Sequence, residues 1–331
     1  MYEASVEQAY WFLLAFESRL STRVINRVIA NWLQEGRTLQ DFFAADPQAW
    51  SDICQLQKKH IEKLLQLRAN AVPPQGMPLP LAQLLYIKQL ERENIHILPV
   101  LDAGYPALLK SVLKAEQLPP ALCYLGNLSI LEHPTVAIIG VRDAGEESLS
   151  FTREVACYLV EHSVTIISGN ARGIDSAALE GTMNAHGSIV LVLPHGLRKL
   201  HKVERQKLQA GIETGHILLL SQFHPDAPWL ISRAMERNKI VTGLAQAVIV
   251  AESGIQGGTW EGANGALKQE RPLYVRQTDT ADSPSGNTLL LEKGGIPLAW
   301  PMQNIAAAPL LLLEENQQGH LSDITKMLLH T

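Results

Sequence analysis

Small residues and arginine occur together at two points where an apolar, strand-like run gives way to a helix. The first point is Gly140-Val141-Arg142, and the second is the segment 168–175. Backbone amides at the start of a helix bind anions, and glycine lets a ligand approach them closely. A guanidinium at a strand end can hold phosphate through two parallel hydrogen bonds. These turns predict a site for a phosphate-bearing ligand.

Two later segments carry the same chemistry, a cationic stretch at 233–239 and a glycine-rich loop at 257–259. Together with the first two turns they give one predicted phosphate-binding set: Arg142, Ser168, Gly169, Arg172, Gly173, Arg233, Arg237, Asn238, Lys239, Gly257, Gly258 and Thr259. The alternative for each cation is an ordinary solvated charge, with Arg142 paired to Asp143 or Glu146. The sequence leaves both interpretations open.

Four other features have a structural and a functional interpretation. We expect Asp175 to cap the helix that follows it by accepting free backbone N–H groups. Trp229 and Trp260 could stack on bases, but core packing is favoured for both. Glu261 is either a structural carboxylate or a group that acts at a ribose. The histidines are spaced too irregularly for a metal site, so no metal is predicted.

Composition limits the classes of protein to consider. The 331 residues carry a net charge of −5, and 46% of them are hydrophobic, which is typical of a globular protein with a substantial core. Bulk positive charge is excluded as a means of binding nucleic acid. The three cysteines form no CxxC pair, and no signal peptide or membrane-spanning run is found. A cytoplasmic location without membrane contact is therefore expected.

Hydrophobic periodicity predicts an α/β chain with two domains. Residues 1–72 show helical spacing and predict a small all-α domain like a SAM or helix-hairpin module, and the proline-rich stretch 73–80 predicts a linker. From 81 to 300, near-continuous Val/Ile/Leu runs alternate with crossover-length segments, as in an extended Rossmann-like, doubly wound, mostly parallel sheet. The remaining residues, 301–331, are too few for a further domain. The runs predict strands at 95–98, 136–139, 164–167, 189–193, 217–220, 247–251 and 273–275.

Several short motifs in order resemble the DprA/Smf family of DNA-processing proteins. The resemblance covers roughly residues 80 to 298, and its motifs include Tyr105-Pro106, Pro119-Pro120, Gly140 with Arg142, Ser168-Gly169, Gly173-Ile174-Asp175, Arg237-Asn238-Lys239-Ile240-Val241 and Ser285-Gly286-Asn287. It implies a non-enzymatic, cofactor-free homodimer that binds single-stranded DNA by its backbone, with Arg142 among the contacts. It also implies work with a RecA-type recombinase in DNA processing, recombination and uptake during natural transformation.

The chain departs from the family pattern near the predicted site. Segment 257–263 looks more like the glycine loop of the LOG phosphoribohydrolases of the same superfamily, and the winged-helix module of many DprA members is not evident after residue 300. A second hypothesis is therefore a nucleotide sensor, or an N-glycosidic hydrolase that uses Arg142 and Glu261. In a third, the N-terminal helices are an interaction surface and the pocket has no role.

Overall fold

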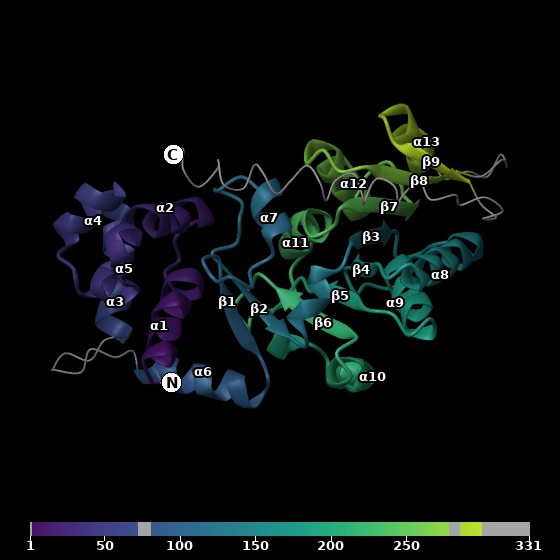
Figure 1. Cartoon of the computed structure of the whole chain (residues 1–331). Coiled ribbons are helices and arrows are strands. Elements are labelled where there is room, and N and C mark those ends of the chain that lie inside the picture. Colours follow the sequence, from purple (N-terminus) through teal and green to yellow (C-terminus); the bar gives the residue numbers. More distant parts are fainter. Residues whose placement is uncertain (1, 72–80, 278–284, 300–331) are drawn as a thin grey trace. The chain divides into compact units, whose positions relative to one another are not determined.

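The computed structural model describes residues 2–71, 81–277 and 285–299. The chain separates into two compact units (Figure 1). One, here called the helical unit, comprises Met1–Tyr105, Leu113–Leu125 and Gln222–Pro225. The other, the sheet unit, comprises Pro106–Val112, Gly126–Ser221 and Asp226–Thr331. No helix in the described ranges is long and apolar enough to cross a membrane.

The helical unit is built from amphipathic helices and one antiparallel strand pair. The helical spacing predicted within residues 1–72 is seen in α2, where five apolar residues are buried: Val24, Ile25, Val28, Ile29 and Trp32. Asp46 caps α4 through the amide of Gln48, and a capping box at Thr38 starts α3. The elements are α1 (Tyr2–Phe12), η1 (Leu13–Glu17), α2 (Thr22–Trp32), η2 (Gln34–Gly36), α3 (Leu39–Ala44), α4 (Pro47–Cys54), α5 (Lys58–Ala71), α6 (Leu81–Arg92), β1 (His96–Pro99) and β2 (Ala121–Leu125).

The sheet unit has parallel strands in the order β6-β5-β4-β3-β7-β8-β9. These strands are β3 (Thr135–Gly140), β4 (Thr165–Ser168), β5 (Ile189–Val192), β6 (Ile217–Ser221), β7 (Ala247–Glu252), β8 (Leu273–Gln277) and β9 (Ile296–Ala299). The central strands are buried along most of their length, which explains their continuous apolar runs. Strand order reverses at β3 and β7, where doubly wound sheets leave a crevice at the carboxyl edge.

The sheet unit also contains helices, most of which connect these strands. They are α7 (Ala107–Val112), η3 (Leu128–Glu132), α8 (Glu146–Glu161), α9 (Ile174–Asn184), η4 (Leu197–Lys199), α10 (Lys202–Glu213), α11 (Ile231–Gly243), α12 (Gly258–Lys268) and α13 (Ser285–Glu292). Helices α8 and α9 pack together, as do α11 and α12. The loops that follow β3, β4 and β7 therefore open at the sheet edge where the predicted phosphate site lies.

The structure confirms the predicted fold class, a mixed α/β chain with a mostly parallel sheet and helices at the N-terminus. The predicted strands are present with boundaries shifted by a few residues at most. Strands β2 and β9 were not predicted, because each is short and flanked or interrupted by proline. The predicted linker 73–80 and tail 301–331 fall outside the described residues, and the predicted domain limits stay predictions.

A buried amide fixes the carboxyl ends of β7 and β8. The Asn287 side chain is fully buried; its Oδ1 accepts from the amide of Ser253 at 2.8 Å, and its Nδ2 donates to the carbonyls of Ala251 and Arg276. The neighbouring Gly286 lies against the same loop, where a Cβ would stand 2.2 Å from the Ser253 carbonyl oxygen. The loop that leads to the glycine-rich segment is therefore held by α13.

We expect Asn287→Leu to lower the free energy of unfolding by about 3 kcal/mol, because a buried N–H and two carbonyls lose their partner without replacement. Urea denaturation of the full chain measures this. Thr288→Ala, one residue further on an exposed position, is the control and should leave the midpoint unchanged. Equal midpoints for the two variants would show that the Asn287 bonds do not stabilise the loop.

Candidate functional site

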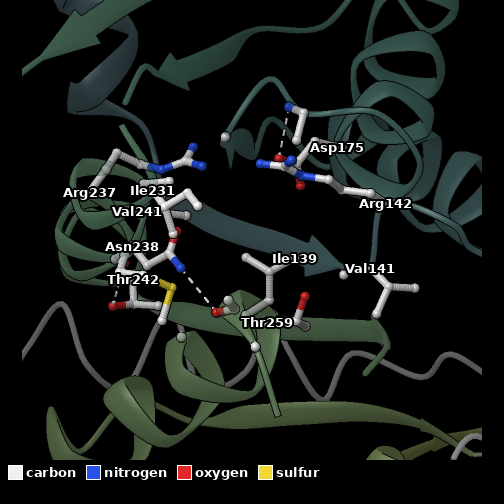
Figure 2. Close-up of a pocket in the computed structure, with 18 of the residues that line it drawn as sticks. Ile139, Val141, Arg142, Asp175, Ile231, Arg237, Asn238, Val241, Thr242 and Thr259 are labelled. Atoms are coloured by element: carbon white, nitrogen blue, oxygen red, sulfur yellow. Dashed lines mark hydrogen bonds between the residues drawn. The ribbon is translucent and has the colours of Figure 1, made fainter. Parts of the chain in front are cut away.

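A cavity of about 560 Å³ lies at the carboxyl edge of the sheet unit, among the loops after β3, β4 and β7 and beside α11. In Figure 2, Arg142 and Asp175 lie on one side of it, and Arg237 lies with Ile231 and Val241 of α11 on the other. Its lining residues are Ile139, Gly140, Val141, Arg142, Gly169, Ala171, Asp175, Trp229, Ile231, Ala234, Met235, Arg237, Asn238, Val241, Thr242, Gln256, Gly257, Gly258, Thr259 and Gly262.

Arg237 is a buried cation in the wall of this cavity. Only 6% of the residue is exposed, although it lines the cavity, and its Nη1 donates to the carbonyl of Val192 at 2.7 Å. Its Nε has no hydrogen-bond partner among the described residues. Burial lowers the pKa of Arg237, the charge of Asp175 raises it and that of Arg142 lowers it. A guanidinium stays protonated in proteins, so this group presents fixed positive charge.

Gly169 makes room for this guanidinium. A Cβ at position 169 would stand 1.9 Å from Arg237 Nη1 and 2.6 Å from its Cζ. Glycine is required here for space, since no side chain can coexist with Arg237 in this position. The predicted motif Ser168-Gly169 thus serves Arg237 directly.

Gly173 is required for a different reason. Its φ of +76° is a conformation that side-chain-bearing residues rarely adopt, and a Cβ would lie 2.4 Å from the carbonyl oxygen of Arg142. Gly173 is also the N-cap of α9, although it does not line the cavity. It brings the loops after β3 and β4 into contact.

The prediction that Asp175 caps α9 is wrong. Asp175 occupies the second position of the helix after its N-cap Gly173, which makes no side-chain cap bond. Its Oδ2 reaches backwards instead and accepts from the amide of Ala171 at 3.0 Å. Burial raises the pKa of Asp175, and the Arg237 charge and the Ala171 bond act against that rise. Asp175 therefore shapes the loop after β4 and partly balances Arg237.

Arg142 and Trp229 stand at the cavity's exposed rim. Arg142 is exposed, and its Cζ lies 5.9 Å from the centre of the Trp229 ring, within reach of a cation–π contact. Trp229 is 46% exposed, so the prediction that it packs in the core is wrong. Trp229 stands in the loop before α11, and an apolar side chain in a surface loop is not necessarily buried. Trp260 is half-buried under Lys293 and does not line the cavity.

The glycine-rich loop closes the cavity from the β7 side. Gly257 has a φ of +93° and is the N-cap of α12, so α12 begins in the cavity wall. Asn238 Nδ2 donates to the carbonyl of Gly258 at 3.0 Å and joins this loop to α11. Thr259 lines the cavity beside them.

The structure thus brings seven predicted residues to one cavity: Arg142, Gly169, Arg237, Asn238, Gly257, Gly258 and Thr259. It places the other five outside its lining: Ser168, Arg172, Gly173, Arg233 and Lys239.

For three of these five residues, the structure shows why the side chain does not line the cavity. The Ser168 hydroxyl is buried and donates to the carbonyl of Ile138. The Arg172 side chain is 83% exposed and lies 3.9 Å from Asp143. Arg233 donates to the carbonyl of Pro228.

Glu261 is exposed and does not line the cavity, although it belongs to the first turn of α12. The carboxylate that does line it is Asp175, which is engaged with Ala171. The hydrolase hypothesis assigned the carboxylate role to Glu261, and this geometry does not favour it. Among the described residues, no group of three His, Cys, Asp or Glu side chains could hold a metal ion.

Sequence reasoning missed the apolar wall of the cavity. Residues at 231, 234, 235, 238, 241 and 242 of α11 all line it, and these positions recur at the three- and four-residue spacing of one helix face. Ile231 is 72% exposed and Met235 37% exposed. Helical periodicity within 231–243 was the signal that could have found this wall.

Known proteins resemble this chain in sequence. A family model described as DNA recombination-mediator protein A matches residues 96–308. The chain is 30% identical to Protein Smf of Escherichia coli over 64% of its length and 56% of the relative's. It is 28% identical to Protein Smf of Synechocystis, over 82% of its own length and 65% of the relative's length. It is 30% identical to DNA processing protein DprA of Streptococcus pneumoniae, over 63% of its own length and 72% of the relative's length. The chain thus covers less than two thirds of the two Smf relatives.

Solved structures share the fold. The Streptococcus pneumoniae DprA structure gives a TM-score of 0.58 at 24% identity, covering 82% of this chain and 94% of that one. DNA processing protein A from Helicobacter pylori, solved to describe its single-stranded DNA binding mode, gives 0.55 at 24% identity, covering 68% and 96%. Because the family model matches well over half of the residues, the chain belongs to the DNA recombination-mediator protein A family, the family of the DprA and Smf proteins.

Proposed function

We propose that this protein binds single-stranded DNA through its phosphate backbone in the cavity beside Arg237. The observation that carries the proposal is the convergence of a buried guanidinium and an exposed one, Arg237 and Arg142, on a cavity walled by glycine loops. Charged donors at a strand end and the amides at the start of α12 are suited to phosphate oxygens. The Helicobacter pylori relative, described by its single-stranded DNA binding, supports this choice of ligand.

Single strands suit this cavity better than duplex DNA. A phosphate that enters a recessed site beside an apolar wall must come from a backbone that can bend and expose its bases. Contacts to phosphate carry no sequence information, so we expect little sequence preference and a steep dependence on salt. The chain's net charge of −5 makes a local site, rather than a broad cationic surface, the means of binding.

The wider role follows from family membership and is part of the proposal. We infer that the protein acts in DNA processing, recombination and uptake in natural transformation as a cytoplasmic, non-enzymatic homodimer that works with a RecA-type recombinase. The contacts proposed for DNA are those predicted residues that line the cavity. The oligomeric state can be measured by sedimentation, and the recombinase contact by loading of a RecA-type protein onto coated single strands.

Arg142→Ala should weaken binding of a single-stranded oligonucleotide at least ten-fold, because a charge-assisted phosphate contact is lost. Fluorescence anisotropy at fixed salt measures the affinity. Arg172→Ala is the matched control, since it removes the same charge from a neighbouring loop but outside the cavity lining. An equal loss for both variants would mean that overall charge, not the cavity, governs binding.

Gly169→Ala should also weaken binding strongly, because the added methyl displaces the Arg237 guanidinium. Gly265→Ala is its control: nothing lies within 4 Å of the position, and alanine stabilises a helix relative to glycine by about 1 kcal/mol. Affinity and thermal stability should be measured together for both. A Gly169→Ala protein that is folded and binds like the wild type would remove Arg237 from the proposed site.

A further inference from the structure

Six cationic side chains of the helical unit lie in two short segments, around the starts of α2 and α5. Helix α4 packs against both of these helices, so the two segments belong to one part of the unit (Figure 1). Segments 18–28 and 55–67 hold one acidic residue, Glu62, on a chain whose net charge is −5. The six cationic residues, here called the cationic face, are Arg19, Arg23, Arg27, Lys58, Lys59 and Lys63.

Contacts between the two segments hold these charges on one surface. Lys63 Nζ donates to the carbonyl of Arg19 at 2.8 Å, and Arg27 Nη1 donates to the carbonyl at the C-cap of α4 at 3.4 Å. Burial lowers the pKa of His60, and the charges of Lys59, Lys63 and Arg27 lower it further. Cations from both helices therefore lie near one histidine ring.

The chain does not neutralise the cationic face itself. Five of the six side chains are exposed, and Arg27 is half-buried. Within the part of the chain that the structure describes, none of the six forms an ion pair with a carboxylate. Like charges held close together repel one another and weaken the fold. The face therefore presents its charge to a partner outside the chain.

Helix stability does not account for these cations. The amino end of a helix carries partial positive charge, which favours acidic side chains there and disfavours basic ones. Helix α3 of the same unit follows this rule, with Asp41 in its first turn. The first turns of α2 and α5 instead contain Arg23, Lys58 and Lys59 and no acidic residue. A bound polyanion would relieve the repulsion between these charges and their helices.

The chemistry of the cationic face fits the phosphates of a DNA duplex. Segments 18–28 and 55–67 contain no Phe, Trp or Tyr, the rings on which the bases of a single strand stack. A duplex covers its bases and presents one phosphate charge per roughly 1.7 Å of its axis. Cations fixed on two helices match phosphates fixed in regular rows, and such contacts do not read sequence.

We propose that the cationic face of the helical unit binds duplex DNA through its phosphates. The inference goes beyond the proposed function and does not depend on it, because the cavity is lined by residues of the sheet unit and is proposed to take a single strand. Together the two sites would give the chain a means of holding single-stranded and duplex DNA at once.

The experiment measures two ligands by fluorescence anisotropy across a salt series: a short thymidine oligonucleotide and a blunt duplex of about twenty base pairs, roughly two helical turns. The test protein is Arg23→Glu/Lys59→Glu. The control is Lys88→Glu/Arg92→Glu, which makes the same charge change at two exposed positions of α6 in the same unit. Thermal unfolding is recorded for both. The test protein should be at least as stable as the wild type, because glutamate suits the amino end of a helix.

We expect the test protein to bind the duplex about ten-fold more weakly, with the slope of log affinity against log salt shallower by about 1.8, as for two lost phosphate contacts on B-DNA. The control should bind the duplex like the wild type, and all three proteins should bind the single strand alike. An unchanged duplex affinity in the test protein, an equal loss in the control, or an equal loss for the single strand would overturn the inference.

Two further outcomes separate the ligands. Competition by poly-glutamate as effective as that of the duplex, at equal charge concentration, would assign the cationic face to an acidic protein and overturn the inference. A wild type that binds the single strand but not the duplex would overturn the inference and leave the proposed function intact. A wild type that binds the duplex through this face but no single strand would overturn only the proposed function.

Discussion

The structure of the site depends on one buried cation. Taking a guanidinium out of water is unfavourable unless hydrogen bonds and opposite charge compensate. Arg237 has the Val192 carbonyl as an acceptor and the Asp175 carboxylate as a nearby charge, while its Nε is left without a partner among the described residues. A buried donor of this kind can be completed by a ligand or by water, and Arg237 is one that lines the cavity.

The need to accommodate and compensate the Arg237 guanidinium constrains the loops around it. The chain after β4 must be glycine at 169 so that the guanidinium fits, and Asp175 must turn back onto Ala171 so that its charge faces the same space. On the opposite side, α13 holds the loop after β7 through Asn287, and this loop leads to Gly257 and the start of α12. These loops and α11 enclose a cavity whose lining combines charged, polar and apolar side chains.

The fold could be predicted because buried parallel strands are long apolar runs, and those runs need no tertiary information to be recognised. The site was predicted only in part. Arg233, Arg237 and Lys239 form one cationic cluster in sequence, but Lys239 follows Arg237 by two residues, about 200° around α11, and so leaves the helix on another side. Arg233 lies one turn before Arg237 on the same side of α11, and its guanidinium is bound to the carbonyl of Pro228. Arg237 alone among the three reaches the cavity.

Local sequence also misled at Asp175 and Trp229. An acidic residue at a helix start usually binds the helix amides, yet Asp175 lies two positions past the N-cap of α9 and turns back to the preceding loop instead. Tryptophan is usually well buried, but Trp229 stands in a loop beside Arg142 at the cavity rim. Both outcomes depend on contacts between segments far apart in the chain.

The most direct measurement follows the guanidinium of Arg237 itself. In a protein labelled with ¹⁵N-arginine, and assigned with Arg237→Lys, the Nε–H resonance of Arg237 is recorded during titration with a single-stranded oligonucleotide. The account predicts a shift of this resonance that saturates with binding, because the ligand supplies the acceptor that Nε lacks among the described residues. An Arg237 resonance that stays in place while the oligonucleotide binds would contradict it.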